Sequence, residues 1–68
     1  MLSLFVNGSP HVCRKPTATI ADLVRELDME DRRIAVERNG EIVPRSRHEL
    51  TPLAAGDRIE VVAAVGGG

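Results

Sequence analysis

The chain holds two Asn-Gly pairs, at 7–8 and 39–40, and each pair lies between short apolar runs. Asn-Gly is the strongest short signal for a two-residue hairpin turn, because both residues adopt positive φ at low cost. Before the first pair, Leu2, Leu4 and Val6 alternate with other residues, which is the period of a half-buried strand. The two pairs therefore predict two β-hairpins.

The C-terminal part of the sequence predicts one further strand in addition to the two hairpins. The last strand shows the clearest alternation and is followed directly by glycine, and a Gly-Asp turn at 55–57 precedes it. The segment 45–51 is expected to be irregular or to form a single helical turn. We predict strands over 2–6, 11–14, 34–38, 41–43 and 58–65.

One helix is predicted between the two hairpins. Thr19 is suited to the N-cap, and Asp22, three residues later, completes a near-capping box. The helix is expected to run to about Asp28. Its apolar positions follow the spacing i, i+3, i+4 and i+7, which forms one stripe for burial, and they are Ile20, Leu23, Val24 and Leu27.

The order β-β-α-β-β-β predicts an α+β fold with the helix on one face of a mixed sheet. A right-handed crossover makes the first and last strands parallel neighbours in the middle of that sheet. This is the β-grasp, or ubiquitin-like, architecture, and the choice of this topology rests partly on the family resemblance given below. We expect one domain over 1–65 and a flexible glycine tail over 66–68.

Size and composition exclude several classes of function. A domain of 68 residues spends its apolar side chains on the core and has little left to line a substrate pocket, so we do not expect an enzyme. A net charge of −1 and one aromatic residue argue against nucleic-acid binding. No signal peptide or membrane span is visible, and one cysteine fits a reducing compartment. The expectation is a cytoplasmic protein that acts through partners.

The glycine run 66–68 has two interpretations. It is either a frayed terminus or a tail without side chains, thin enough to thread a narrow channel in another protein. In the second case the carboxylate of Gly68 is unhindered and open to close approach. Because a carboxylate is a poor electrophile, it would need activation by a partner that consumes ATP.

The remaining reactive side chains suggest no catalytic or metal centre. Cys13 lies within a strand and is expected to be a packed thiol rather than an activated thiolate. His11 and His48 are far apart in the sequence and lack cysteine or carboxylate partners at ligand spacing. We therefore expect no metal site.

Two groups are candidates for docking. If Leu2 and Leu4 face the helix, Phe5 faces outward, and Val62 and Ala64 follow by the same alternation. A small basic cluster over 45–48, with Arg38 nearby, is interpreted either as a solvated loop or as a patch for an acidic or phosphate-bearing partner. The candidate docking residues are Phe5, Val62, Ala64 and Val65, with Arg38, Arg45 and Arg47 as polar candidates.

Three segments together resemble a known family. They are VERNGEIVPR at 36–45, LAAGDRIEVV at 53–62 and VGGG at 65–68. These segments, and the length and element order of the whole chain, are similar to the ThiS family, the sulfur carrier proteins of thiamine biosynthesis.

The resemblance implies a ubiquitin-like fold and a carrier chemistry. An adenylating, E1-like enzyme would attach AMP from ATP to the carboxylate of Gly68. Sulfur from a persulfide donor protein would then displace AMP and leave a thiocarboxylate, which thiazole synthase would use to build the thiazole ring. Gly66 and Gly67 would thread the partner active sites, and no cofactor would be bound permanently.

Three other classes remain open. The small subunit of molybdopterin synthase is a similar sulfur carrier, but it is usually longer between its fourth and fifth strands. A protein-conjugating modifier would also use a glycine terminus, to form isopeptide bonds. A non-covalent β-grasp interaction module would not need the glycines.

Overall fold

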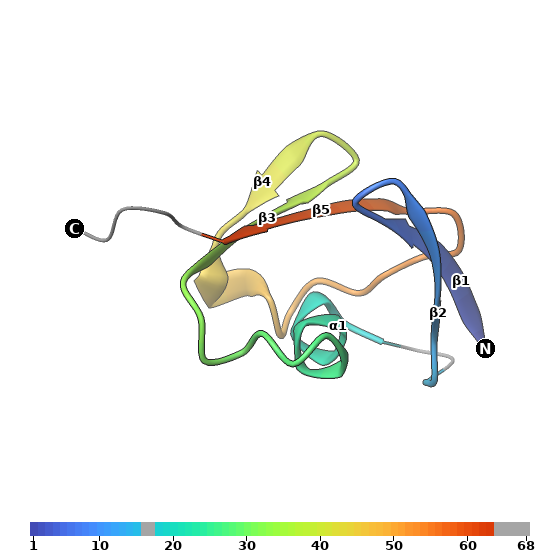
Figure 1. The fold of residues 1–68 in the computed structure, drawn as a ribbon, viewed down its shortest axis with the longest axis horizontal. Coiled ribbons are helices and arrows are strands. Elements are labelled where there is room, and N and C mark those ends of the chain that lie inside the picture. The colour runs from blue at the N-terminus through green and yellow to red at the C-terminus, as the bar shows by residue number, and fades with distance from the viewer. Residues whose placement is uncertain (16–17, 64–68) are drawn as a thin grey trace.

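The computed structural model describes residues 1–15 and 18–63 (Figure 1). Two hairpins flank one helix, as the Asn-Gly turns predict, and Asn7 and Asn39 both adopt positive φ, at 50° and 52°. The elements are β1 (Leu2–Val6), β2 (Ser9–Cys13), α1 (Ile20–Glu26), β3 (Ile34–Arg38), β4 (Glu41–Val43), a 3₁₀ turn η1 (Arg45–Arg47) and β5 (Arg58–Ala63).

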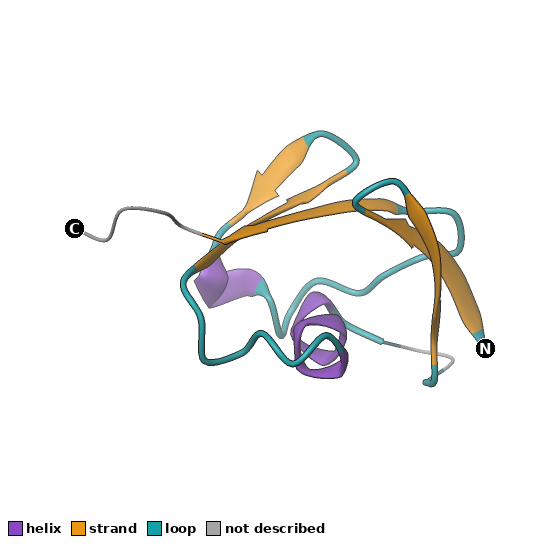
Figure 2. Cartoon of the chain, in the orientation of Figure 1, coloured by secondary structure: helices purple, strands orange, loops and turns teal. Residues whose placement is uncertain are grey.

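The five strands form one mixed sheet in the order β2-β1-β5-β3-β4. β1 and β5 are parallel, with Phe5 beside Arg58, while β5 and β3 are antiparallel. The first and last strands are therefore neighbours in the middle, which confirms the predicted β-grasp topology. Helix α1 and η1 lie on one side of the sheet, and the other side is left open (Figure 2).

The helix begins as the sequence predicts. The Thr19 side chain accepts the N–H of Asp22, and the Asp22 carboxylate accepts the N–H of Thr19 at 3.0 Å. Its end comes earlier than the expected Asp28. Leu27 is the C-cap, and Asp28 adopts φ 59°, a left-handed conformation that closes the last turn.

The core lies between α1 and the covered face of the sheet. Ile20 and Leu23 are fully buried against inward-facing residues of the central strands, such as Val36 and Ile59. Leu27 is half-buried at the edge of this cluster. The predicted apolar stripe of the helix is thus confirmed.

Two strand boundaries differ from the prediction. β2 begins at Ser9 and ends at Cys13, and so includes Pro10, which the sequence pattern placed outside it. Proline is tolerated there because β2 is an edge strand. β5 is described to Ala63, and the expected continuation to 65 and the glycine tail 66–68 lie outside the described residues.

Candidate functional site

The open face of the sheet carries most of the exposed large apolar side chains. Phe5 is 41% exposed and Val62 is 58% exposed, so the predicted outward orientation of both is confirmed. Ala64 and Val65 lie outside the described residues. The docking role of this face remains a prediction.

Two further members of this face were missed. Val12 is 50% exposed and Ile42 is 71% exposed. Val12 pairs with Ser3 on β1, and Ile42 pairs with Glu37 on β3, so both lie on the same side of the sheet as Phe5. Alternation within each short strand assigns their faces only once the register is known, and the sequence alone does not specify the register. We call these four residues, Phe5, Val12, Ile42 and Val62, the open-face apolar group.

Charged residues separate the members of the open-face apolar group. On β5, Arg58 lies beside Phe5 of β1, and Glu60 lies between Arg58 and Val62; both charged residues are exposed. A depression of about 310 Å³ lies beside Phe5 and is also lined by Arg58 and Glu60. A partner that docks here must therefore match both apolar and charged groups.

Arg38 is paired with a buried carboxylate of the fold, and its docking role remains a prediction. Its Nε donates to Asp57 Oδ2 at 2.8 Å, and Asp57 is buried. Burial acts to raise the pKa of the Asp57 carboxyl, but hydrogen bonds from the Ala54 N–H, Arg38 and Asn39 outweigh it and hold that pKa below its ordinary value. The structure thus gives Arg38 a structural partner that the sequence did not reveal.

The residues of the predicted basic cluster over 45–48 differ in their surroundings. Arg45 Nη2 donates to the carbonyl of Glu30 at 3.1 Å, and Arg47 is exposed on η1. His48 is buried, and its Nε2 lies 3.1 Å from the Val43 carbonyl oxygen. The interpretation of 45–48 as a solvated loop is therefore wrong at His48, because the 3₁₀ turn directs that ring inward.

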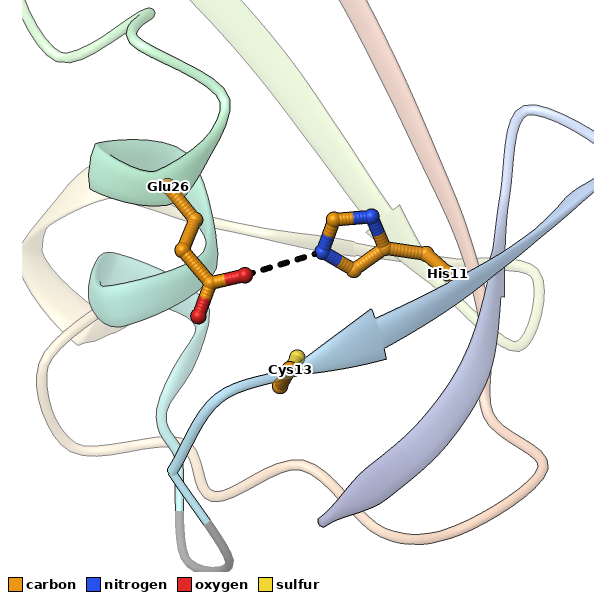
Figure 3. A group of neighbouring side chains, drawn as sticks. All are labelled: His11, Cys13 and Glu26. Carbon is orange, nitrogen blue, oxygen red and sulfur yellow. Dashed lines mark hydrogen bonds and ion pairs between the residues drawn. The ribbon is translucent and has the colours of Figure 1, made fainter.

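His11, Cys13 and Glu26 form a group that the sequence analysis missed (Figure 3). Their ligand atoms lie within 4.8 Å of one another, and His11 Nε2 lies 3.0 Å from Glu26 Oε1. The premise that His11 lacks cysteine or carboxylate partners was wrong, because Glu26 comes from α1 and Cys13 follows at i+2. Spacing along the strand could have indicated the His11–Cys13 pair.

Cys13 itself is a packed thiol, as predicted. It has no exposed surface, and burial raises the pKa of its thiol, with the Glu26 and Asp22 carboxylates adding to the effect. A thiol that is buried and protonated is a poor nucleophile. This group therefore does not support covalent catalysis at Cys13.

Among the described residues, no helix has the length and apolar content to cross a membrane.

Comparison with known proteins places the chain in one family. The sequence profile of the ThiS family matches residues 5–68. The sulfur carrier protein ThiS of Bacillus subtilis is 40% identical over 65 residues, which covers 96% of this chain and 98% of that protein. A thiazole synthase of Paramagnetospirillum magneticum is 39% identical over 67 residues, but the chain spans only 20% of that protein's length.

A solved structure agrees with the sequence comparison. The crystal structure of a thiamine biosynthesis protein (ThiS) from Geobacter metallireducens matches with a TM-score of 0.83 and 30% identity. The match covers 98% of this chain and 100% of that one. The profile match, the full-length relative and the shared β-grasp fold together show that the chain belongs to the ThiS family.

Proposed function

We propose that this chain is a sulfur carrier for thiazole formation in thiamine biosynthesis, with Gly68 as the carrier residue. One observation carries the proposal: the family profile matches through residue 68, and the Bacillus subtilis sulfur carrier is matched over 98% of its length. The match to the family profile thus includes the glycine run.

The proposed chemistry takes place at the carboxylate of Gly68. A carboxylate oxygen attacks the α-phosphorus of ATP, pyrophosphate leaves, and the acyl-adenylate makes the carbon electrophilic. The terminal sulfur of a persulfide then attacks this carbon and AMP leaves. A thiol cleaves the resulting sulfur–sulfur bond, so that the thiocarboxylate remains on the carrier and the donor leaves as a disulfide.

The glycines explain why the chain would serve as a substrate while the partner enzymes carry out catalysis. Gly66 and Gly67 present no Cβ, so partner active sites of different shape can accept the same tail. Catalysis would come from the partners, and the chain would be their substrate rather than an enzyme. ATP and the persulfide would be bound by those partners, in the cytoplasm.

The open-face apolar group is the proposed docking surface for the adenylating enzyme and for thiazole synthase. It lies on the face that α1 leaves uncovered, and β5 crosses it toward the glycine run. Thiazole synthase is supported as a partner by relatives of that name in which a segment similar to this chain forms 20% of the protein.

The test is a sulfur transfer reaction followed by intact mass. The chain is incubated with its adenylating enzyme, ATP, a persulfide donor and a thiol. We expect a mass gain equal to replacement of one oxygen by sulfur, located at Gly68 by fragmentation. The control is the chain without Gly67 and Gly68, which should gain nothing.

The other outcomes separate the remaining classes. A stable adduct with a second protein would favour a conjugating modifier, and absence of both the adenylate and the sulfur gain would overturn the carrier proposal. If the chain gains sulfur, and if it rescues a molybdenum-cofactor mutant but not a thiamine auxotroph, the chain is assigned to molybdenum-cofactor synthesis.

A further inference from the structure

Three different metal-ligating side chains converge at the edge of the sheet, on the side opposite the open-face apolar group. His11 and Cys13 project from the inner face of edge strand β2, and Glu26 is the last residue of α1 (Figure 3). Because they are two residues apart on one strand, His11 and Cys13 share a face. The topology thus supplies one nitrogen, one sulfur and one oxygen ligand from two elements.

The spacing of these ligand atoms is close to that of a tetrahedral zinc site. All three lie within 4.8 Å of one another, and His11 Nε2 is 3.0 Å from Glu26 Oε1. Zinc–ligand distances of 2.0–2.3 Å place tetrahedral ligands about 3.3–3.7 Å apart. Closing the group around an ion would require side-chain rotation of His11 and Glu26, and each is exposed over about a quarter of its side chain, so neither is held by packing on all sides.

The carboxylate is already oriented toward this group. Glu26 Oε2 accepts the backbone N–H of Arg14 at 3.1 Å, which leaves Oε1 directed at His11. Such outer contacts are a regular feature of built metal sites because they fix the ligand before the ion arrives. Cys13 has no exposed surface and is therefore the most deeply buried of the three residues.

The charge of the ligands and their chemical softness indicate which metal ion fits this group. A cysteine thiolate and a glutamate carboxylate together carry two negative charges, so a divalent cation gives a neutral centre beside the core. Sulfur and imidazole ligands suit zinc, whereas calcium and magnesium require oxygen ligands.

We infer that His11, Cys13 and Glu26 form a zinc-binding site, with water as the fourth ligand, that fastens edge strand β2 to the end of α1. Binding forms the S–Zn, N–Zn and O–Zn bonds and releases the Cys13 thiol proton to solvent. The inference goes beyond the proposed function and does not depend on it.

The test uses the purified chain with Co²⁺ as a spectroscopic probe and Zn²⁺ as a competitor, in a phosphine reductant that contains no thiol. We expect one Co²⁺ per chain, with tetrahedral visible bands and a thiolate-to-cobalt band in the near ultraviolet. One equivalent of Zn²⁺ should remove these bands. Zn²⁺ should also raise the melting temperature, because an ion that binds only the folded chain stabilises it.

Variants assign the ligands. Cys13→Ala should abolish the thiolate band, and Glu26→Gln should weaken Co²⁺ binding by about tenfold or more. The matched control is Glu41→Gln, an exposed glutamate on β4 at the other edge of the sheet, which should bind as the parent does. If Cys13→Ala does not fold, Glu26→Gln and His11→Gln carry the test, since both side chains are partly exposed.

Three results would overturn the inference. One is a Co²⁺ spectrum without the thiolate band in the folded parent chain. Another is binding that Glu26→Gln and Glu41→Gln weaken equally. The third is a melting temperature that Zn²⁺ leaves unchanged at a concentration that saturates the probe.

Discussion

Asn7 binds the backbone of Val61 through both ends of its side-chain amide. Its Nδ2 donates to the Val61 carbonyl at 3.2 Å, and its Oδ1 accepts the Val61 N–H at 2.8 Å. The two residues are 54 positions apart in the sequence. The residue that forms the first hairpin turn therefore also joins that turn to the last strand.

We predict that Asn7→Gly destabilises the domain by about 1–2 kcal/mol, because two hydrogen bonds are lost. Glycine accepts the φ of 50° found at Asn7, so the turn itself is retained. Urea unfolding of both proteins measures the difference. A matched control is Ser9→Gly, at an exposed position beside the same turn, and equal effects of the two substitutions would contradict the role of the amide.

Asp57 accepts hydrogen bonds from three groups that converge near the second turn. The Ala54 N–H and Arg38 Nε each donate to Oδ2 at 2.8 Å, and Asn39 Nδ2 donates to Oδ1 at 3.0 Å. Asp57→Asn should cost about 2–3 kcal/mol, because an amide places its own N–H groups against these donors and removes the charge that pairs with Arg38.

Chemical denaturation of Asp57→Asn, Arg38→Gln and the double variant measures this coupling. We expect the two effects to be less than additive, since each substitution removes the same ion pair. Strict additivity would show that Arg38 and Asp57 act independently.

The free energy of unfolding at acid pH should also depend on the Asp57 carboxylate. Hydrogen bonds hold the pKa of Asp57 below its ordinary value against the opposing effect of burial, and the Thr19 N–H is the main cause of a lowered pKa at Asp22. A carboxyl with a lowered folded pKa stabilises the fold above its unfolded pKa of about 3.9, and this stability is lost as the pH falls through the folded value.

We therefore expect the free energy of unfolding to fall as the pH drops below about 4, with a smaller slope in Asp57→Asn. Denaturation series at constant ionic strength between neutral and acid pH measure both slopes. Equal slopes in the two proteins would show that Asp57 does not contribute to acid unfolding.

Asp28 holds a left-handed conformation at the C-terminal end of α1. Its φ is 59°, and its N–H donates to the Arg25 carbonyl at 3.0 Å, while the Met29 N–H donates to the Val24 carbonyl at 3.0 Å. These two bonds form a Schellman motif, in which glycine is the preferred residue at this position.

Asp28→Gly should stabilise the domain by about 0.5–1 kcal/mol, because it removes backbone strain and a negative charge near the helix C-terminus. The melting temperature of Asp28→Gly is the measurement. Asp31→Gly is the control, since Asp31 is exposed nearby without positive φ, and it should not stabilise.

Local patterns were sufficient to predict most of the fold. The alternation in 2–6, the two Asn-Gly turns and the Thr19–Asp22 capping box act over a few residues, and each reappears in the structure. The early end of α1 was missed because Asp28 is an uncommon choice for a left-handed cap, and periodicity gives no sign of it.

The contacts that join distant segments could not be predicted in the same way. Glu26 meets His11, and Arg38 meets Asp57, only because the topology brings α1 beside β2 and the end of β3 beside the turn before β5. Such pairs are set by register and layer packing, which a single sequence does not specify. The same limit hid Val12 and Ile42 from the predicted docking group.

The docking role of the open-face apolar group is tested most directly at Phe5. Because Phe5 is 41% exposed, the domain should stay folded in Phe5→Asp, but under the proposed docking the substitution places a charge where a partner would bury the aromatic ring. An aromatic anchor at an interface contributes about 2 kcal/mol or more, so adenylation at subsaturating carrier should fall by about thirtyfold. Pyrophosphate release with the adenylating enzyme measures this rate.

The matched control for Phe5→Asp is Leu50→Asp. Leu50 is 72% exposed and follows η1, away from the open face of the sheet, so its substitution adds the same charge to a different surface. Circular dichroism confirms that both variants are folded before the rates are compared. If both slow adenylation equally, net charge rather than docking explains the loss. If only Phe5→Asp slows it, Ile42→Asp and Val12→Asp then measure how far the docking surface extends across the sheet.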